Sequence, residues 1–213
     1  MAKLINLFTF SGRVGDLVGC QGPRGYYVRS RQRKSSKPPT AKQLEARARM
    51  ARVMDFLTPL REIIYVGFDS KSNRGYKTGA LSKAISHAMR KAVLGKYPDW
   101  YIDPSEIRLS QGDLLPLRIR EIVPMGSGVV CVKWNTTQVR RRAFDDDRVF
   151  VIAYRYPDKV LVVAENQRSA GEVSVDTSSD RPGSEWLLYA CAAERDLSRF
   201  SNSQFLGKVR IDG

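Results

Sequence analysis

Basic and aromatic side chains suited to binding anions and protein surfaces lie close together near the N-terminus. The set consists of Arg24, Tyr26, Tyr27, Arg29, Arg31, Arg33, Lys34 and Lys37. Guanidinium and ammonium groups neutralise phosphates, and tyrosine rings stack on nucleic-acid bases. Arginine and tyrosine are also enriched where proteins dock onto one another. These residue types predict a surface for a protein partner or for a polyanion, and both interpretations stay open beside that of a solvated face.

The positive charge of the protein is concentrated in this part of the chain. The 213 residues carry a formal net charge of +14. Residues 1–49 contain eleven lysines and arginines against Asp16 and Glu45, which gives this segment a net charge of +9. A local field of this sign attracts nucleic acid, anionic lipid or an acidic protein face.

The glycines among these residues do not form a phosphate-binding loop. A Walker loop needs G-x4-G-K-[ST] and a dinucleotide fingerprint needs G-x-G-x-x-G, and this stretch has neither. The glycines instead separate short β-compatible runs, where positive φ angles suit tight hairpin turns. The pattern predicts a small β-ribbon without a core of its own. The turn glycines are Gly12, Gly15, Gly19, Gly22 and Gly25.

Side chains that catalysis or metal binding would need are few. His87 is the only histidine, and it lies to one side of the apolar stripe of its predicted helix, so we expect an exposed or boundary residue rather than a base. The acids Asp145–Asp147 follow Arg140–Arg142 without EF-hand spacing, which favours a solvated loop over a calcium site. The sequence predicts no catalytic residue, no cofactor and no metal site.

Two helices are predicted to follow the ribbon, after a polar linker. Thr40 and Gln43 match a capping box at the start of a helix that ends before Pro59. Apolar residues at helical spacing predict a second helix over residues 78–94, with Gly95 just beyond its end.

From about residue 106 the apolar pattern changes to short and alternating runs, which are typical of an antiparallel β-sandwich. We expect Trp134 and Trp186 to face inward with their alternate neighbours, so that Cys131 and Cys191 face outward and form no disulfide. With Cys20, three scattered cysteines are too few for a disulfide scaffold or a zinc site. The predicted strands are "GVVCVKWN", "RVFVIAYRY", "VLVVAE", "GEVSVDT", "EWLLYACAAE" and "QFLGKVRI".

The order of these strands resembles that of fibronectin type III domains. Trp134 ends the second strand, a strand with Tyr154–Tyr156 follows, and "RPGSEWLLYACAA" is similar to the PG-x-E-Tyr opening of strand F in that family. Trp186 stands where the family usually has tyrosine. The resemblance covers residues 106–213 and implies a sandwich domain that serves recognition.

A second resemblance extends over nearly the whole chain. The segments "SGRVGDLVG", "GYYVRSR", "TAKQLEARARMARVMDFLTPL", "GKYPDWYIDPSEIRLSQGDL" and "FSNSQFLGKVRI" resemble a family of unknown function common in Bacteroidota. Residues 10–60 also look like segments of short phage proteins encoded among virion genes. These resemblances imply a binding or assembly protein, with a virion or another large complex as its context, and they imply no catalytic residue.

Together these observations predict an α+β protein with an N-terminal β-ribbon, two helices and a fibronectin type III-like antiparallel sandwich, divided into residues 1–105 and 106–213. We expect a non-enzymatic structural or adaptor protein that docks through its basic arm into a homo- or hetero-oligomeric assembly. The alternative is a nucleic-acid-binding protein that uses the same arm. No apolar run is long enough to span a bilayer, and an odd number of cysteines suits a reducing compartment, so we expect a cytoplasmic or virion-associated protein.

Overall fold

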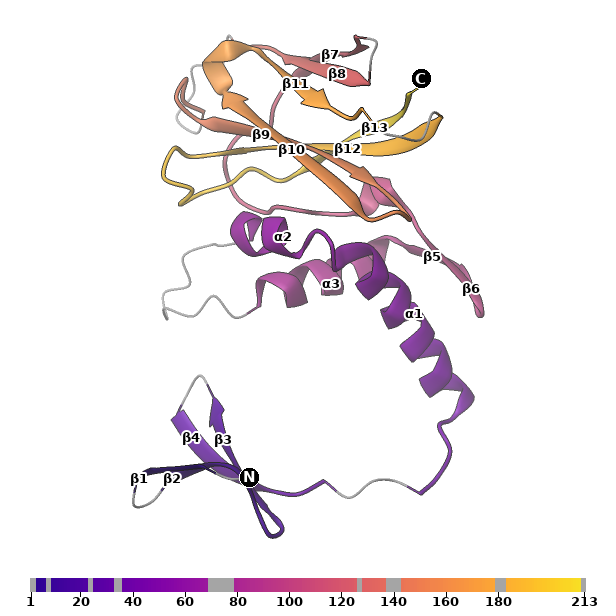
Figure 1. The fold of residues 1–213 in the computed structure, drawn as a ribbon, viewed down its shortest axis with the longest axis vertical. Coiled ribbons are helices and arrows are strands. Elements are labelled where there is room, and N and C mark those ends of the chain that lie inside the picture. The colour runs from indigo at the N-terminus through magenta and orange to yellow at the C-terminus, as the bar shows by residue number, and fades with distance from the viewer. Residues whose placement is uncertain are drawn as a thin grey trace. The chain divides into compact units, whose positions relative to one another are not determined.

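The chain folds into two compact units, Met1–Ala41 and Lys42–Gly213, in a computed structural model. The structure describes residues 3–6, 9–22, 25–32, 36–68, 79–125, 128–136, 143–178 and 183–211. The protein is α+β, with an N-terminal antiparallel sheet, three helices and several further antiparallel sheets (Figure 1). None of the helices in these ranges is long and apolar enough to cross a membrane.

The expected β-ribbon is an antiparallel sheet whose strands pair in chain order. Gly15, at φ 57°, lies in the turn between the second and third strands, as predicted. Gly19 has a different role, because a Cβ there would lie 1.9 Å from the carbonyl oxygen of Phe10. Only glycine allows the two backbones to approach this closely. The strands are β1 (Lys3–Asn6), β2 (Thr9–Val14), β3 (Leu17–Gly22) and β4 (Gly25–Ser30).

Three helices follow, where the sequence predicted two. Helix α1 (Ala41–Leu57) has the predicted bounds, and α2 (Arg61–Gly67) comes after the proline that ends it. Helix α3 (Ala80–Lys91) ends before the predicted residue 94, because the next residues form β5 (Val93–Lys96) and pair with β6 (Asp99–Ile102). The predicted first residue of this helix, Thr78, lies outside the described residues.

The remaining strands form a four-stranded sheet, β10-β9-β12-β13, and a three-stranded sheet, β11-β8-β7. All six predicted strands are present, and β7 is an additional one. Their bounds are β7 (Ile119–Pro124), β8 (Val129–Trp134), β9 (Arg148–Arg155), β10 (Val160–Gln167), β11 (Glu172–Asp176), β12 (Ser184–Ala193) and β13 (Gln204–Ile211).

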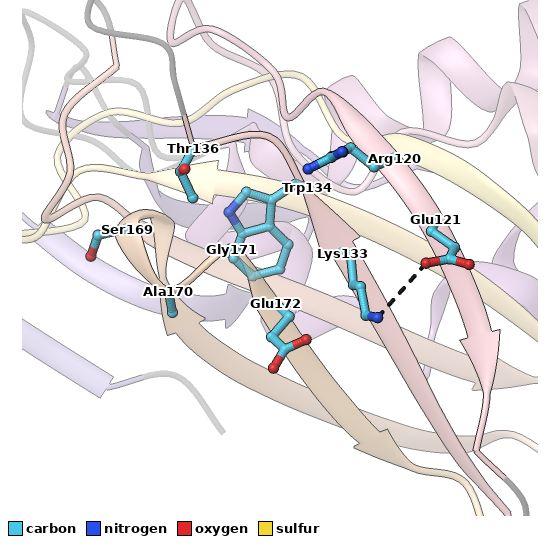
Figure 2. Close-up of a pocket in the computed structure, with 9 residues that line it drawn as sticks. All are labelled: Arg120, Glu121, Lys133, Trp134, Thr136, Ser169, Ala170, Gly171 and Glu172. Atoms are coloured by element: carbon cyan, nitrogen blue, oxygen red, sulfur yellow. Dashed lines mark ion pairs between the residues drawn. The ribbon is translucent and has the colours of Figure 1, made fainter.

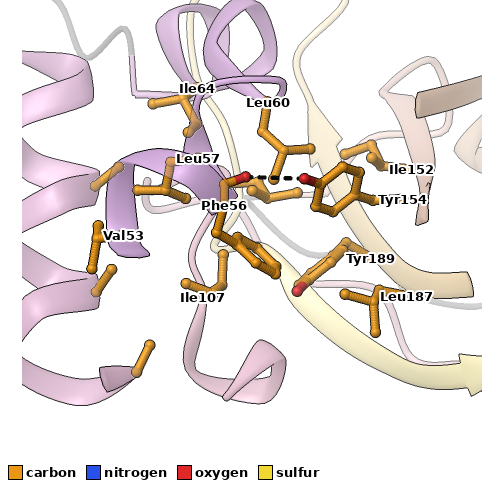
Figure 3. Packing of buried hydrophobic residues seen from close by; sticks show 14 of the residues in the cluster. Val53, Phe56, Leu57, Leu60, Ile64, Ile107, Ile152, Tyr154, Leu187 and Tyr189 are labelled. Atoms are coloured by element: carbon orange, nitrogen blue, oxygen red, sulfur yellow. Dashed lines mark hydrogen bonds between the residues drawn. The ribbon is translucent and has the colours of Figure 1, made fainter. Parts of the chain in front are cut away.

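The four-stranded sheet lies between the helices and the three-stranded sheet (Figure 1), and its central strands β9 and β12 are buried on both faces. On β9, Val151 packs toward the three-stranded sheet, while Ile152 and Tyr154, which point to the other face, contribute to the core under the helices. Figure 3 shows this second core, where Phe56 of α1 meets Tyr154 and Tyr189. The helices therefore belong to the same compact unit as the sheets, whereas the division expected from the sequence, after residue 105, separates them.

The predicted alternation of side chains along these strands is correct, but the two cysteines predicted to face outward are not exposed to solvent. Trp134 and Trp186 pack in the core between the two sheets, and Cys131 and Cys191 point to the opposite sides as free thiols. Both cysteines are nevertheless only 3% exposed. Cys191 lies under the helical layer, and this burial raises the pKa of its thiol to about 11.

The acid run is solvated at Asp145 and Asp146, but the prediction was wrong for Asp147, which is 1% exposed. Its carboxylate lies 3.1 Å from the guanidinium of Arg168, the first residue of the short helix η2 (Arg168–Ala170), and accepts a hydrogen bond from the Phe144 amide. Arg168 also donates to the carbonyl of Leu115, and its own carbonyl accepts from the indole of Trp134. A charged side chain is buried here because an arginine from another segment of the chain pairs with it. The arginines that precede the acid run, residues 140–142, lie outside the described residues.

Candidate functional site: the two faces of the N-terminal sheet

The residues predicted to bind a partner lie on or after β4, which forms one end of the N-terminal sheet. Every residue of β4 is exposed, including Tyr26, Tyr27 and Arg29. Arg31 and Lys37, which follow the strand, are exposed as well. The other three predicted residues, Arg24, Arg33 and Lys34, lie outside the described residues.

The strand register places these side chains on two different faces. Residues directly opposite each other in a sheet share a face, and neighbours along a strand alternate. Val18 is opposite Arg29, and Cys20 is opposite Tyr27. Leu17 and Gln21, on the other side of β3, are opposite Ser30 and Tyr26. The predicted set is therefore divided, with Tyr26 on one face and the other described β4 members on the opposite one.

The first face, which we call the apolar face, consists of Val14, Leu17, Tyr26 and Val28. Their exposed fractions are 53%, 50%, 43% and 52%. Among the described positions 9–41, Gly19 alone is buried. The sheet thus presents a cluster of large apolar side chains and has no core beneath it.

The second face, which we call the basic face, consists of Arg13, Tyr27, Arg29 and Arg31. Arg13 and Arg29 flank Val18 from the two neighbouring strands. The amide of Arg31 donates to the carbonyl of Asp16, so the strand alternation continues one step beyond β4. Three guanidinium groups beside one tyrosine ring provide contacts for phosphates and a stacking surface.

Sequence reasoning missed four members of these faces, Arg13, Val14, Leu17 and Val28. The signal that identifies them is the alternation along "LVGCQG" and "GYYVRS" once the turn at Gly15 fixes which residues are opposite. Glycine-rich strands carry little apolar pattern, so the register became clear only from the structure.

The second unit has an open hollow on the outer side of the three-stranded sheet (Figure 2). Lys133 lies 3.7 Å from Glu121 and is directly opposite Glu172 in the strand register. Trp134, at the base, is buried and donates its indole N–H to the Arg168 carbonyl. Because cations and carboxylates alternate around this hollow, it shows no preference for a ligand of either charge, and we assign it no reaction.

His87 is a half-buried residue of α3, as the sequence predicted. Partial burial and the nearby Arg108 lower the pKa of its imidazole. Within the described ranges, no group of three or more histidine, cysteine or acidic residues is placed to hold a metal ion.

Comparison with known proteins relates the chain to one family, and no curated protein matches it. The match is to the family described as "Family of unknown function (DUF6266)", and it covers residues 9–207. The matched range includes β2–β4 of the N-terminal sheet, the three helices and all strands from β5 to β12, and it ends within β13. The chain therefore belongs to the DUF6266 family.

Proposed function

We propose that this protein is a non-enzymatic structural or adaptor protein that docks through its N-terminal sheet into a larger assembly. The observation that carries the proposal is the apolar face, where four large side chains are about half exposed over a sheet with no core. A sheet of this size gains stability when it packs its apolar side against another layer. Exposed apolar patches on small units are characteristic of interaction sites.

The larger unit suits the role of a rigid body that carries this docking element. We propose that seven of its strands, β7 to β13, form a fibronectin type III-like sandwich. A three-stranded and a four-stranded antiparallel sheet around a shared core support this assignment, as does the burial of Trp186 between them. The helical layer on the four-stranded sheet is an addition that a simple two-sheet sandwich lacks.

The resemblance of residues 10–60 to phage proteins encoded among virion genes supports a virion as the assembly. A cytoplasmic or virion-associated protein, in contact with copies of itself or with other subunits, is the corresponding proposal for location and partners. The wider resemblance to proteins of Bacteroidota supports a bacterial or phage origin.

Replacing Leu17 and Val28 together by lysine should abolish docking, because it places two charges on the apolar face. Half-burial of one such side chain contributes about 1 kcal/mol, so we expect association to weaken by at least about tenfold. Sedimentation velocity and co-purification of the full chain measure this. The matched control is Arg29→Gln on the basic face, which should leave association unchanged. A wild-type monomer without a co-purifying partner, or equal association of both variants, would contradict the proposal.

The basic face favours a second candidate function, the binding of nucleic acid. If its arginines neutralise phosphates, binding of a single-stranded oligonucleotide should weaken steeply with salt, because counterions are released. Arg29→Gln with Arg31→Gln should reduce the slope of log K against log salt by about 0.7 per arginine, as measured by fluorescence anisotropy. Val14→Ser on the apolar face should leave the slope unchanged. Absence of binding at about 50 mM salt would eliminate this function.

A further inference from the structure

We propose that the groove between α3 and the segment around Arg108 binds a phosphate-type oxyanion. The groove is an open hollow of about 530 Å³, within the size range of small-ligand sites. Its residues all lie in the second unit, so the proposal is independent of what the N-terminal sheet binds. The hollow is lined by Gly79, Ser82, Lys83, Ser86, His87, Arg90, Arg108 and Gln111.

The helix supplies one wall of the groove as a continuous polar stripe. Ser82, Lys83, Ser86, His87 and Arg90 recur at the three- and four-residue spacing that places side chains on one face of a helix. The opposite side of α3 carries its buried alanines, which hold the helix against the core. The stripe is therefore fixed in position by the same packing that stabilises the fold.

The charged residues that line the hollow, His87 aside, are all cations. Lys83, Arg90 and Arg108 are exposed, and no carboxylate is among the residues that line the hollow. No ion pair involves these three cations among the described residues. This contrasts with the hollow of Figure 2, which includes two carboxylates and where Lys133 forms an ion pair with Glu121. Cations gathered without acids repel one another, and an anion between them relieves this repulsion.

The pKa of His87 is lowered in part by these positive charges. Desolvation is the main cause of its lowered pKa, and the positive charges of Arg108 and Arg90 lower it further. Glu106 raises this pKa through a backbone hydrogen bond and through its negative charge, and each effect is smaller than that of Arg108 and larger than that of Arg90. A bound oxyanion would reverse the effect of the arginines, because it stabilises the protonated imidazole.

The donors of the groove suit a tetrahedral oxyanion. Guanidinium and ammonium groups form charge-assisted hydrogen bonds to phosphate oxygens, and the hydroxyls of Ser82 and Ser86 are additional donors. The Nε of Arg90 donates to the Ser86 carbonyl at 3.1 Å, which fixes one edge of its guanidinium. The ligand class that this chemistry selects is a phosphoryl group, free or within a larger molecule.

The test uses His87 as a unique reporter, because the chain has no other histidine. In the full-length protein, the imidazole proton signals should shift saturably when inorganic phosphate is added at constant ionic strength. Arg108→Gln or Lys83→Gln should each lower phosphate affinity about tenfold, since each removes a charge-assisted hydrogen bond. Lys91, at the end of the same helix, is exposed but does not line the groove. Lys91→Gln should therefore leave phosphate affinity unchanged.

The pH dependence provides a second readout, with sulfate as the probe because its charge stays constant between about pH 5 and pH 8. Four charged side chains share the surroundings of His87: Lys83 and Arg90 on α3, and Glu106 and Arg108 on the facing segment. Protonation of His87 adds a positive charge to the groove, so sulfate affinity should fall as the pH rises through the pKa of the imidazole.

Two results would overturn the proposal. One is the absence of a saturable shift of the His87 signals with inorganic phosphate, with sulfate and with a short single-stranded DNA. The other is an equal loss of affinity in Lys91→Gln and Arg108→Gln, which would indicate general screening. An eight-nucleotide single-stranded DNA, compared with inorganic phosphate at equal phosphate concentration, then identifies the source of the ligand. Binding of the DNA alone assigns the groove to a nucleic-acid backbone, and binding of free phosphate assigns it to a small phosphorylated molecule.

Discussion

Asp147→Ala should lower the free energy of unfolding by about 3–5 kcal/mol, because it leaves the guanidinium of Arg168 buried without its counter-charge. The two side chains are 2% and 4% exposed and 3.1 Å apart. Burial raises the pKa of Asp147 even though Arg168 and the Phe144 amide both lower it, which shows how costly the charge is to bury. Urea unfolding followed by tryptophan fluorescence measures the effect.

The neighbouring Asp146→Ala is the matched control. Asp146 forms an ion pair with Arg195 at 3.8 Å, and the two side chains are 58% and 83% exposed. Such a surface pair contributes no more than about 1 kcal/mol, so this variant should unfold almost as the wild type does. If both variants lost the same stability, the buried pair would not have the role that we give it.

Phe56→Ala should lower the free energy of unfolding by about 3–5 kcal/mol, because this side chain joins the helical layer to the four-stranded sheet. Its ring packs edge-on against Tyr154 with the centroids 5.2 Å apart (Figure 3), and the centroid of the Tyr156 ring lies at the same distance. The hydroxyl of Tyr154 donates to the Phe56 carbonyl at 3.3 Å. Loss of the ring leaves a cavity between two layers that are both fixed by other contacts.

Leu44→Ala on the same helix controls for a change in helix propensity. Leu44 is 42% exposed, whereas Phe56 is 1% exposed. Alanine is the best helix former, so the control should alter stability by less than about 1 kcal/mol. Thermal unfolding by circular dichroism compares the two variants. A Phe56→Ala protein as stable as Leu44→Ala would mean that the helices do not depend on this contact.

Much of the fold could be predicted from local signals in the sequence. Helix α1 has the predicted bounds because Thr40 precedes its first residue and Pro59 ends the pattern. Six strands of the four-stranded and three-stranded sheets were recognised because Gly, Pro, Asp and Ser separate short apolar runs. The end of α3 was wrong because Val93 pairs with Ile102, a tertiary contact that overrides helical spacing.

The burial of the four-stranded sheet on both faces was missed although a signal was present. The runs "VFVIAY" and "WLLYACAA" are continuously apolar, and such runs are typical of strands covered on both sides. Alternation alone assigns Cys191 to an outer face, but it does not show that a helical layer lies there. The ion pair of Asp147 also depends on a residue far along the chain, which no local pattern identifies.

The candidate sites were predicted in type rather than in arrangement. The basic and aromatic character of β4 was clear from the sequence. That Tyr26 and Tyr27 lie on different faces, each with its own set of neighbours, depends on which residues of β3 are opposite them. The groove on α3 was not predicted, because Arg108 comes from a separate segment and joins the helical stripe only after folding.

The strands β9 and β12 each contribute alternate side chains to both hydrophobic cores of the larger unit. The helical layer and the three-stranded sheet therefore pack against opposite faces of the same two strands. A mutation that disrupts the packing of one layer exposes one face of these strands to solvent, and the other layer packs on the opposite face of the same strands. This coupling predicts that residues 42–213 unfold as one cooperative unit, without an intermediate in which a single layer stays folded.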